Sequence, residues 1–123
     1  MRGKISLAAL LGATLVLPAA AAYATAASEV ATAAQHAGFA AAAPDIAQTH
    51  MHLHHAVNCL VGPKGAGFDA TNANPCAKDG AGAIPDESDA TVKARLQSGV
   101  ATAEAGIASS DLATAHKDAT TVA

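Results

Sequence analysis

The sequence predicts an all-α fold, a small antiparallel helical bundle of about four helices with one long loop. The chain is rich in alanine, the residue with the highest helix propensity. Proline and glycine separate segments of helical periodicity, and no useful stretch alternates apolar and polar residues as a strand would. Short links join these segments except over residues 62–87, so consecutive helices should run antiparallel.

Residues 1–24 are expected to be a signal peptide rather than part of this fold. A basic start precedes an apolar run over residues 5–17, which is shorter than the roughly 20 residues that a membrane span needs. The motif Ala22-Tyr23-Ala24 favours cleavage after Ala24, with cleavage after Ala22 or an uncleaved anchor as alternatives. Residues 25–123 should then form one small helical domain, periplasmic or secreted, with no membrane segment.

Acidic residues outnumber basic ones in this predicted mature chain. Arg2 and Lys4 are two of the seven lysines and arginines, and all ten acidic residues lie after the leader, so the mature chain carries a formal charge of −5. Because DNA and RNA binding draws on a basic patch, the composition excludes nucleic acid as an expected partner. It leaves the identity of any protein partner open.

Cys59 and Cys76 are the only cysteines, and export would place them in an oxidising compartment. A disulfide between them should stabilise the domain by about 3 kcal/mol in the chain-entropy model. Large apolar residues are few, so the core should be thin and in need of such a covalent link. The alternative is a free Cys59 thiolate that binds a metal beside the histidines.

The first two helices are expected on either side of Pro44. Ser28 can cap the first helix, which continues through an alanine-rich segment to about Ala42. Proline is tolerated at the start of a helix, so the second helix should run from Pro44 to Val61. The Gly62-Pro63 pair then ends it.

Residues 62–87 are expected to form one long loop, since glycines and prolines interrupt any regular period there. Ser88 can cap a third helix, and Ser109 or Ser110 a fourth with Asp111 in its first turn. The third helix is predicted by an apolar stripe at helical spacing, formed by Val92, Leu96, Val100, Ala103 and Ile107.

The run His50-Met51-His52-Leu53-His54-His55 holds four of the six histidines. Imidazole is a common ligand of transition metals. At about 100° per residue, a helix separates these side chains into two pairs. His50 and His54 lie at the edge of the predicted buried face, and His52 and His55 lie on the far side. Each pair places two imidazoles within reach of one ion.

A tight site needs a third or fourth ligand from another element. His116 lies on the apolar face of the predicted fourth helix, so it would join His50 and His54 across the bundle and make theirs the tighter site. His36 on the first helix is a second cross-helix candidate. If the protein binds no metal, His36 and His116 are ordinary, partly buried histidines, and His52 and His55 lie on a solvated face.

The segments Ala33-Ala34-Gln35-His36-Ala37 and Ala113-Thr114-Ala115-His116, with the His50/His54 pair, place spaced histidines on alanine-rich helices. Behind a signal peptide, they resemble the small metal-binding helical-bundle proteins of the bacterial periplasm. The resemblance covers the helices and implies a metal-binding role. The chain departs from that pattern because its histidines are concentrated on one helix, and because the long loop and its cysteines have no counterpart.

These patterns favour an exported, non-enzymatic, histidine-rich protein that sequesters or buffers copper, zinc or nickel. An enzyme is not expected, because Met51 stands where the zinc-hydrolase motif His-Glu-x-x-His has its glutamate. The alternative is a disulfide-linked structural or interaction module whose 62–87 loop contacts a partner. The candidate metal ligands are His36, His50, His52, His54, His55 and His116.

Overall fold

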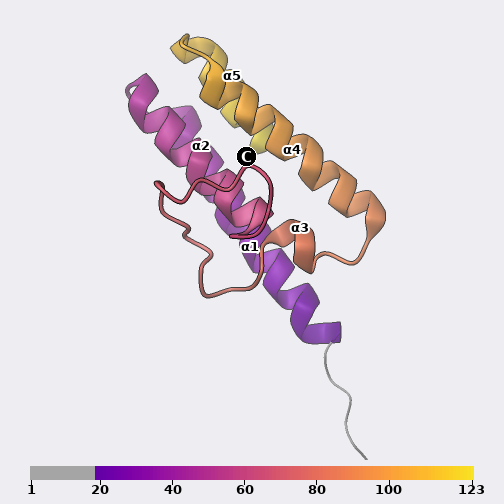
Figure 1. Cartoon of the computed structure of the whole chain (residues 1–123). Coiled ribbons are helices and arrows are strands. Elements are labelled where there is room, and N and C mark those ends of the chain that lie inside the picture. The colour runs from indigo at the N-terminus through magenta and orange to yellow at the C-terminus, as the bar shows by residue number, and fades with distance from the viewer. Residues whose placement is uncertain (1–18) are drawn as a thin grey trace, which may run out of the picture.

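The computed structural model describes residues 19–123, with side chains from Thr25 onward, so most of the predicted signal peptide lies outside the described residues. This part of the chain is all-helical and has no strand, which confirms the predicted all-α class. The helices, shown in Figure 1, are α1 (Ala19–Ala42), α2 (Ile46–Val61), α3 (Ala83–Asp86), α4 (Ala90–Ala108) and α5 (Leu112–Val122).

Helix α1 begins well before the expected cap at Ser28. The alanine-rich residues that precede Ser28 have high helix propensity, so they extend the helix towards the N-terminus. The predicted cleavage site after Ala24 therefore lies within α1.

Aspartate side chains begin the three other long helices. Asp45 accepts a hydrogen bond of 2.8 Å from the Gln48 backbone N–H at the start of α2, which begins after Pro44 rather than at it. Asp89 and Asp111 cap α4 and α5 in the same way. A carboxylate satisfies the free N–H groups of the first turn and also interacts favourably with the helix dipole. The serine caps expected for these two helices are therefore wrong.

Helix α2 lies at the centre of the described structure and contacts each of the other helices. Leu53 and Val57 are its largest completely buried apolar side chains. From Thr25 onward, the buried apolar residues that α1 contributes are all small: Ala26, Ala33, Ala37 and Ala40. Because alanine ends at Cβ, α1 can lie close to α2, but the core that the two helices share is thin, as the composition predicts.

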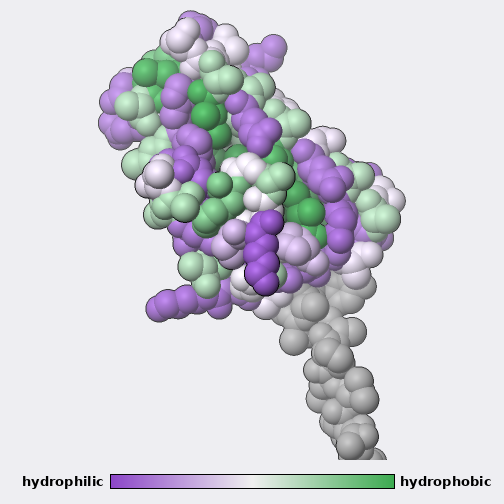
Figure 2. Space-filling model, in the orientation of Figure 1, coloured by the Kyte–Doolittle hydropathy of each residue, from purple (hydrophilic) through white to green (hydrophobic). Residues whose placement is uncertain are grey.

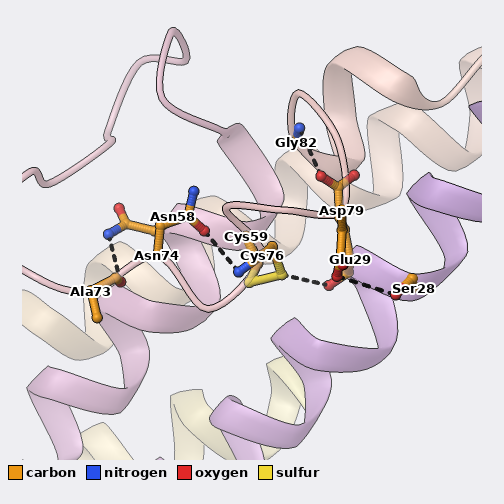
Figure 3. The surroundings of a disulfide bond; sticks show 9 residues. All are labelled: Ser28, Glu29, Asn58, Cys59, Ala73, Asn74, Cys76, Asp79 and Gly82. Atoms are coloured by element: carbon orange, nitrogen blue, oxygen red, sulfur yellow. Dashed lines mark hydrogen bonds between the residues drawn. A yellow bond between two sulfur atoms is a disulfide. The ribbon is translucent and has the colours of Figure 1, made fainter.

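The predicted disulfide between Cys59 and Cys76 is present and joins α2 to the following loop (Figure 3). The alternative of a free Cys59 thiolate is therefore wrong, since neither cysteine is free. The expected loop over residues 62–87 ends in the short helix α3. Gly62 and Gly82 adopt φ values of 68° and 117° and lie so close together that a Cβ atom on either would collide with backbone.

A completely buried asparagine, Asn58, holds the first half of this loop. Its amide nitrogen donates hydrogen bonds to the carbonyl oxygens of Asp69, Asn72 and Ala73 at 2.9, 3.3 and 3.1 Å. Its amide oxygen accepts one from the Asp69 backbone N–H at 2.9 Å. One side chain thus replaces the regular backbone pairing that this segment lacks.

The second half of the loop is attached to α1 through Glu29, whose side chain is completely buried. Its Oε1 accepts a 2.9 Å hydrogen bond from the Gly82 backbone N–H, and its Oε2 has no hydrogen-bond partner. Burial raises the pKa of Glu29 to about 7, and the negative charges of Asp86 and Asp79 contribute to the rise. Figure 3 shows Glu29 beside the disulfide, and the Cys76 sulfur lies 3.9 Å from the Glu29 carbonyl oxygen.

Candidate metal centre

Three histidines from two helices meet on one side of the molecule. His36 comes from α1, and His52 and His55 come from α2. Each offers a ring nitrogen, and these three nitrogens lie within 4.8 Å of one another. Among the described residues, no other group of three histidine, cysteine or acidic side chains is placed in this way.

The packing of α1 on α2 creates this group. His52 and His55 are one helical turn apart, so they share a side of α2. On α1, His36 lies between the buried alanines Ala33 and Ala37, which pack into the core. The same close contact that buries these alanines brings the His36 ring to the two histidines of α2.

The distances within the group suit a metal ion held by imidazoles. The Nδ1 atoms of His36 and His52 are 3.3 Å apart. Two nitrogens that each lie about 2.05 Å from a tetrahedral zinc ion are about 3.3 Å from each other. The His55 ring centroid is 5.0 Å from that of His36 and 5.6 Å from that of His52, so the three rings form one compact group.

Two of these histidines, His36 and His55, have lowered pKa values, which favours a bound cation. Burial lowers the pKa of His36, and the neighbouring His55 and His52 lower it further. Burial likewise lowers the pKa of His55, with additional effects from His52 and His54. Metals bind the neutral form of imidazole, so a lowered pKa reduces competition from protons.

His55 carries a second indication of a ligand, because its buried Nδ1 atom has no hydrogen-bond partner. Leaving a buried polar atom unsatisfied costs about 1–3 kcal/mol. Coordination of a metal by this atom would remove that cost. The donor set and the unsatisfied nitrogen therefore both fit a bound transition metal.

Phe39 forms one edge of the centre and was not among the residues predicted from the sequence. Its ring contacts His36 edge-on at 5.6 Å between centroids, and it contacts His52 at 5.5 Å. It remains 47% exposed. The spacing of three residues between His36 and Phe39 on one helix is the sequence signal that could have identified it.

The remaining histidines each contact another part of the protein. His50 Nε2 lies 2.9 Å from the carbonyl oxygen of Ser109, where α4 ends, and His116 Nε2 lies 3.0 Å from that of Ala43, where α1 ends. His54 Nδ1 lies 3.4 Å from Asp69 Oδ2 in the loop. These residues connect the helices and the loop.

The structure therefore corrects the expected grouping of ligands. His50, His54 and His116 do not converge, since each ring reaches a different partner. The expectation that His52 and His55 face water and lack a third ligand is wrong. Helix α1 covers their side of α2 and supplies His36. Helical periodicity assigned the two histidine pairs to different sides of α2, but it could not show which neighbouring element lies against each pair.

No family model, curated protein or solved structure matches this chain. Within the described residues, no helix is both long and apolar enough to cross a membrane. The geometry of the histidine group therefore carries the functional argument.

Proposed function

We propose that this protein is an exported, non-enzymatic metal-binding protein that sequesters or buffers copper, zinc or nickel at His36, His52 and His55. The observation that carries the proposal is the approach of three ring nitrogens from two helices to within 4.8 Å of one another. The disulfide supports export, because such bonds persist mainly in oxidising compartments. We also propose that the long helices pack as an antiparallel bundle, as the short links between them predict.

The type of ligand narrows the choice of metal. Imidazole suits zinc, copper and nickel, whereas calcium and magnesium prefer oxygen ligands. Three protein ligands leave a further coordination position for water or for an incoming ligand of another molecule. Such a site can release its ion to a partner, as a buffering role requires.

The single substitution His36→Ala tests the proposal most directly. Without His36, the helical pair on α2 retains only two ligands, so affinity for copper(II) or zinc(II) should fall at least about tenfold. Calorimetric titration of the oxidised, tag-free protein measures this change. Affinity should also fall as the pH drops through the histidine range, because protons compete for the same nitrogens.

The matched control is His116→Ala, which also removes one partly buried histidine that joins two elements. It should leave metal affinity within about twofold of the wild-type value. Wild-type binding weaker than about 10 μM, which is roughly −7 kcal/mol, would contradict the proposal. An equal loss in both variants would show that the ligands had been assigned to the wrong histidines.

The second candidate function is a disulfide-linked interaction module that uses the loop between α2 and α4. The observation that favours it is the number of contacts that hold this loop, including the Cys59–Cys76 disulfide and the four Asn58 hydrogen bonds. A loop fixed in one conformation loses little entropy when it binds. Failure of the metal titration would favour this function.

A further inference from the structure

A groove lies between the end of α2, the following loop, α3 and α4. It has a volume of about 560 Å³. Its apolar lining includes Val61, Ala66, Ile84, Pro85, Val100 and Ala101. Figure 2 shows apolar surface between the loop and α4, with hydrophilic side chains on both sides. A cavity of this size and composition lies within the usual range for small-molecule sites.

The loop forms one side of this groove, and several contacts hold it in a fixed conformation. Gly62 and Gly82 bring the two ends of the loop into backbone contact, which only residues without a Cβ atom allow. Glu29 holds Gly82 through its backbone N–H, and the Cys59–Cys76 disulfide tethers the segment between the two glycines. The groove therefore exists before any ligand binds, which reduces the entropic cost of binding.

The charges at the groove distinguish it from the rest of this acidic molecule. Lys64 and Lys93 line it, and they are two of the five lysines and arginines that follow the predicted leader. Glu104 is the only acidic residue in the lining, against ten acidic residues in the chain. The groove thus combines an apolar floor with a local excess of positive charge on a protein of negative net charge.

We propose that this groove binds a small amphiphile with an apolar body and an anionic head, such as a medium-chain carboxylate. The apolar part would displace water from the floor formed by residues such as Ile84 and Val100. The head would lie at the rim, where the Lys64 and Lys93 ammonium groups stabilise negative charge. The groove shares no residue with the histidine centre, so its function does not depend on metal binding.

The test is calorimetric titration of decanoate into the oxidised, metal-free protein below the micelle concentration of decanoate. Decanol and decyltrimethylammonium serve as neutral and positively charged comparisons. Decanoate should bind most tightly, and the double variant Lys64→Ala/Lys93→Ala should weaken it about fivefold to tenfold. The control Lys78→Ala/Lys117→Ala removes two exposed lysines outside the lining and should change the affinity less than twofold.

A second pair of variants tests the location independently of charge. Ala101→Phe places a ring into the groove from an exposed position on α4, so the fold should be retained and decanoate binding should be lost. Ala105→Phe adds the same ring to an exposed position of α4 outside the groove and should bind as the wild type does. Circular dichroism confirms that both variants are folded.

Three outcomes would overturn the proposal. Absence of decanoate binding would exclude this class of ligand. Equal affinity for the positively charged amphiphile would show that the lysines do not select the head group. Unchanged binding in a folded Ala101→Phe variant would place the ligand elsewhere on the molecule.

Discussion

At the residue scale, the role of each histidine depends on which neighbouring element lies against it. His50 and His54 are four residues apart on α2, but one reaches the end of α4 and the other reaches Asp69 in the loop. His52 and His55 instead face α1, where His36 completes the group. The same residue type thus provides inter-element contacts on one side of α2 and candidate metal ligands on the other.

Asn58 is the polar residue on which the loop depends most. Replacing it with alanine would leave the Asp69 N–H and several loop carbonyl groups without their partner. Unsatisfied buried polar groups cost about 1–3 kcal/mol each, and partial hydration would offset some of them. We therefore expect Asn58→Ala to lower the free energy of unfolding by about 3 kcal/mol, measured by chemical denaturation.

The matched control for this substitution is Asn72→Ala. The Asn72 side chain donates a 3.0 Å hydrogen bond to Asp69 Oδ2, and it is only partly buried. Its loss should cost about 1 kcal/mol or less. If the two variants unfolded at the same denaturant concentration, the loop would not depend on the buried amide.

At the element scale, α1 contributes to two separate features through one close contact with α2. Its alanines allow that contact, which brings His36 to the histidine centre. Nearer the start of the helix, Glu29 reaches Gly82 and attaches the end of the loop. Thr25 and Ser28 add hydrogen bonds to Asp86 and Asp79 on the same side.

The buried Glu29 carboxyl should make this attachment depend on pH. Its pKa is about 7 in the folded protein against an ordinary value of 4.5, so folding favours the protonated form. The stabilising effect is complete below pH 4.5 and is lost as the pH rises through 7, with a total on the order of 3 kcal/mol. Chemical denaturation between pH 5 and pH 8 would be expected to show this loss.

Glu29→Gln provides the comparison, because glutamine is uncharged and can still accept the hydrogen bond from Gly82. The lowered pKa values of His36 and His55 act in the opposite direction in both proteins, reducing stability at acid pH. The difference between wild type and variant therefore isolates Glu29. A difference that stayed constant over this range would contradict a raised pKa.

At the scale of the whole molecule, covalent and polar contacts supplement a small apolar core. Among the side chains from Thr25 onward, the buried apolar residues of α1 are alanines, and Leu53 is the largest apolar side chain that is completely buried. Alanine buries little apolar area, so it contributes less to stability than leucine or phenylalanine would. The disulfide and the buried amide of Asn58 compensate for this by holding the loop over the end of α2.

Reduction of the disulfide should therefore lower the melting temperature substantially. A separation of 17 residues between the cysteines corresponds to about 3 kcal/mol of lost stability in the chain-entropy model. For a domain of about 100 residues, this predicts a decrease of roughly 10–20 °C, measured by circular dichroism. An unchanged melting temperature after mass spectrometry has verified reduction would show that the core suffices without the link.

The control for reduction is the variant Cys59→Ser/Cys76→Ser. It has no disulfide to reduce, so reductant should leave its melting temperature unchanged. A further decrease in this variant would show that the reductant acts elsewhere on the protein.

The sequence by itself determined the helical class, the division of the chain near Pro44 and Gly62, and the disulfide. Each depends on local chemistry or on composition. Alanine favours helix, proline and glycine interrupt it, and only one pairing of two cysteines exists within a chain. The same local reasoning separated the histidines of α2 into two pairs, because helical periodicity alone decides which side chains share a face.

Only the tertiary structure decided which pair acquires a third ligand. The apolar residues of α2 indicated one buried face, but α1, α4 and the loop cover different sides of the helix, and Cys59 and Asn58 are completely buried as well. An alanine-rich helix carries a weak amphipathic signal, so its sequence does not show which side faces its neighbour. Whether His36 or His116 reaches a given pair depends on the packing of whole helices, and the structure brings His36 to His52 and His55.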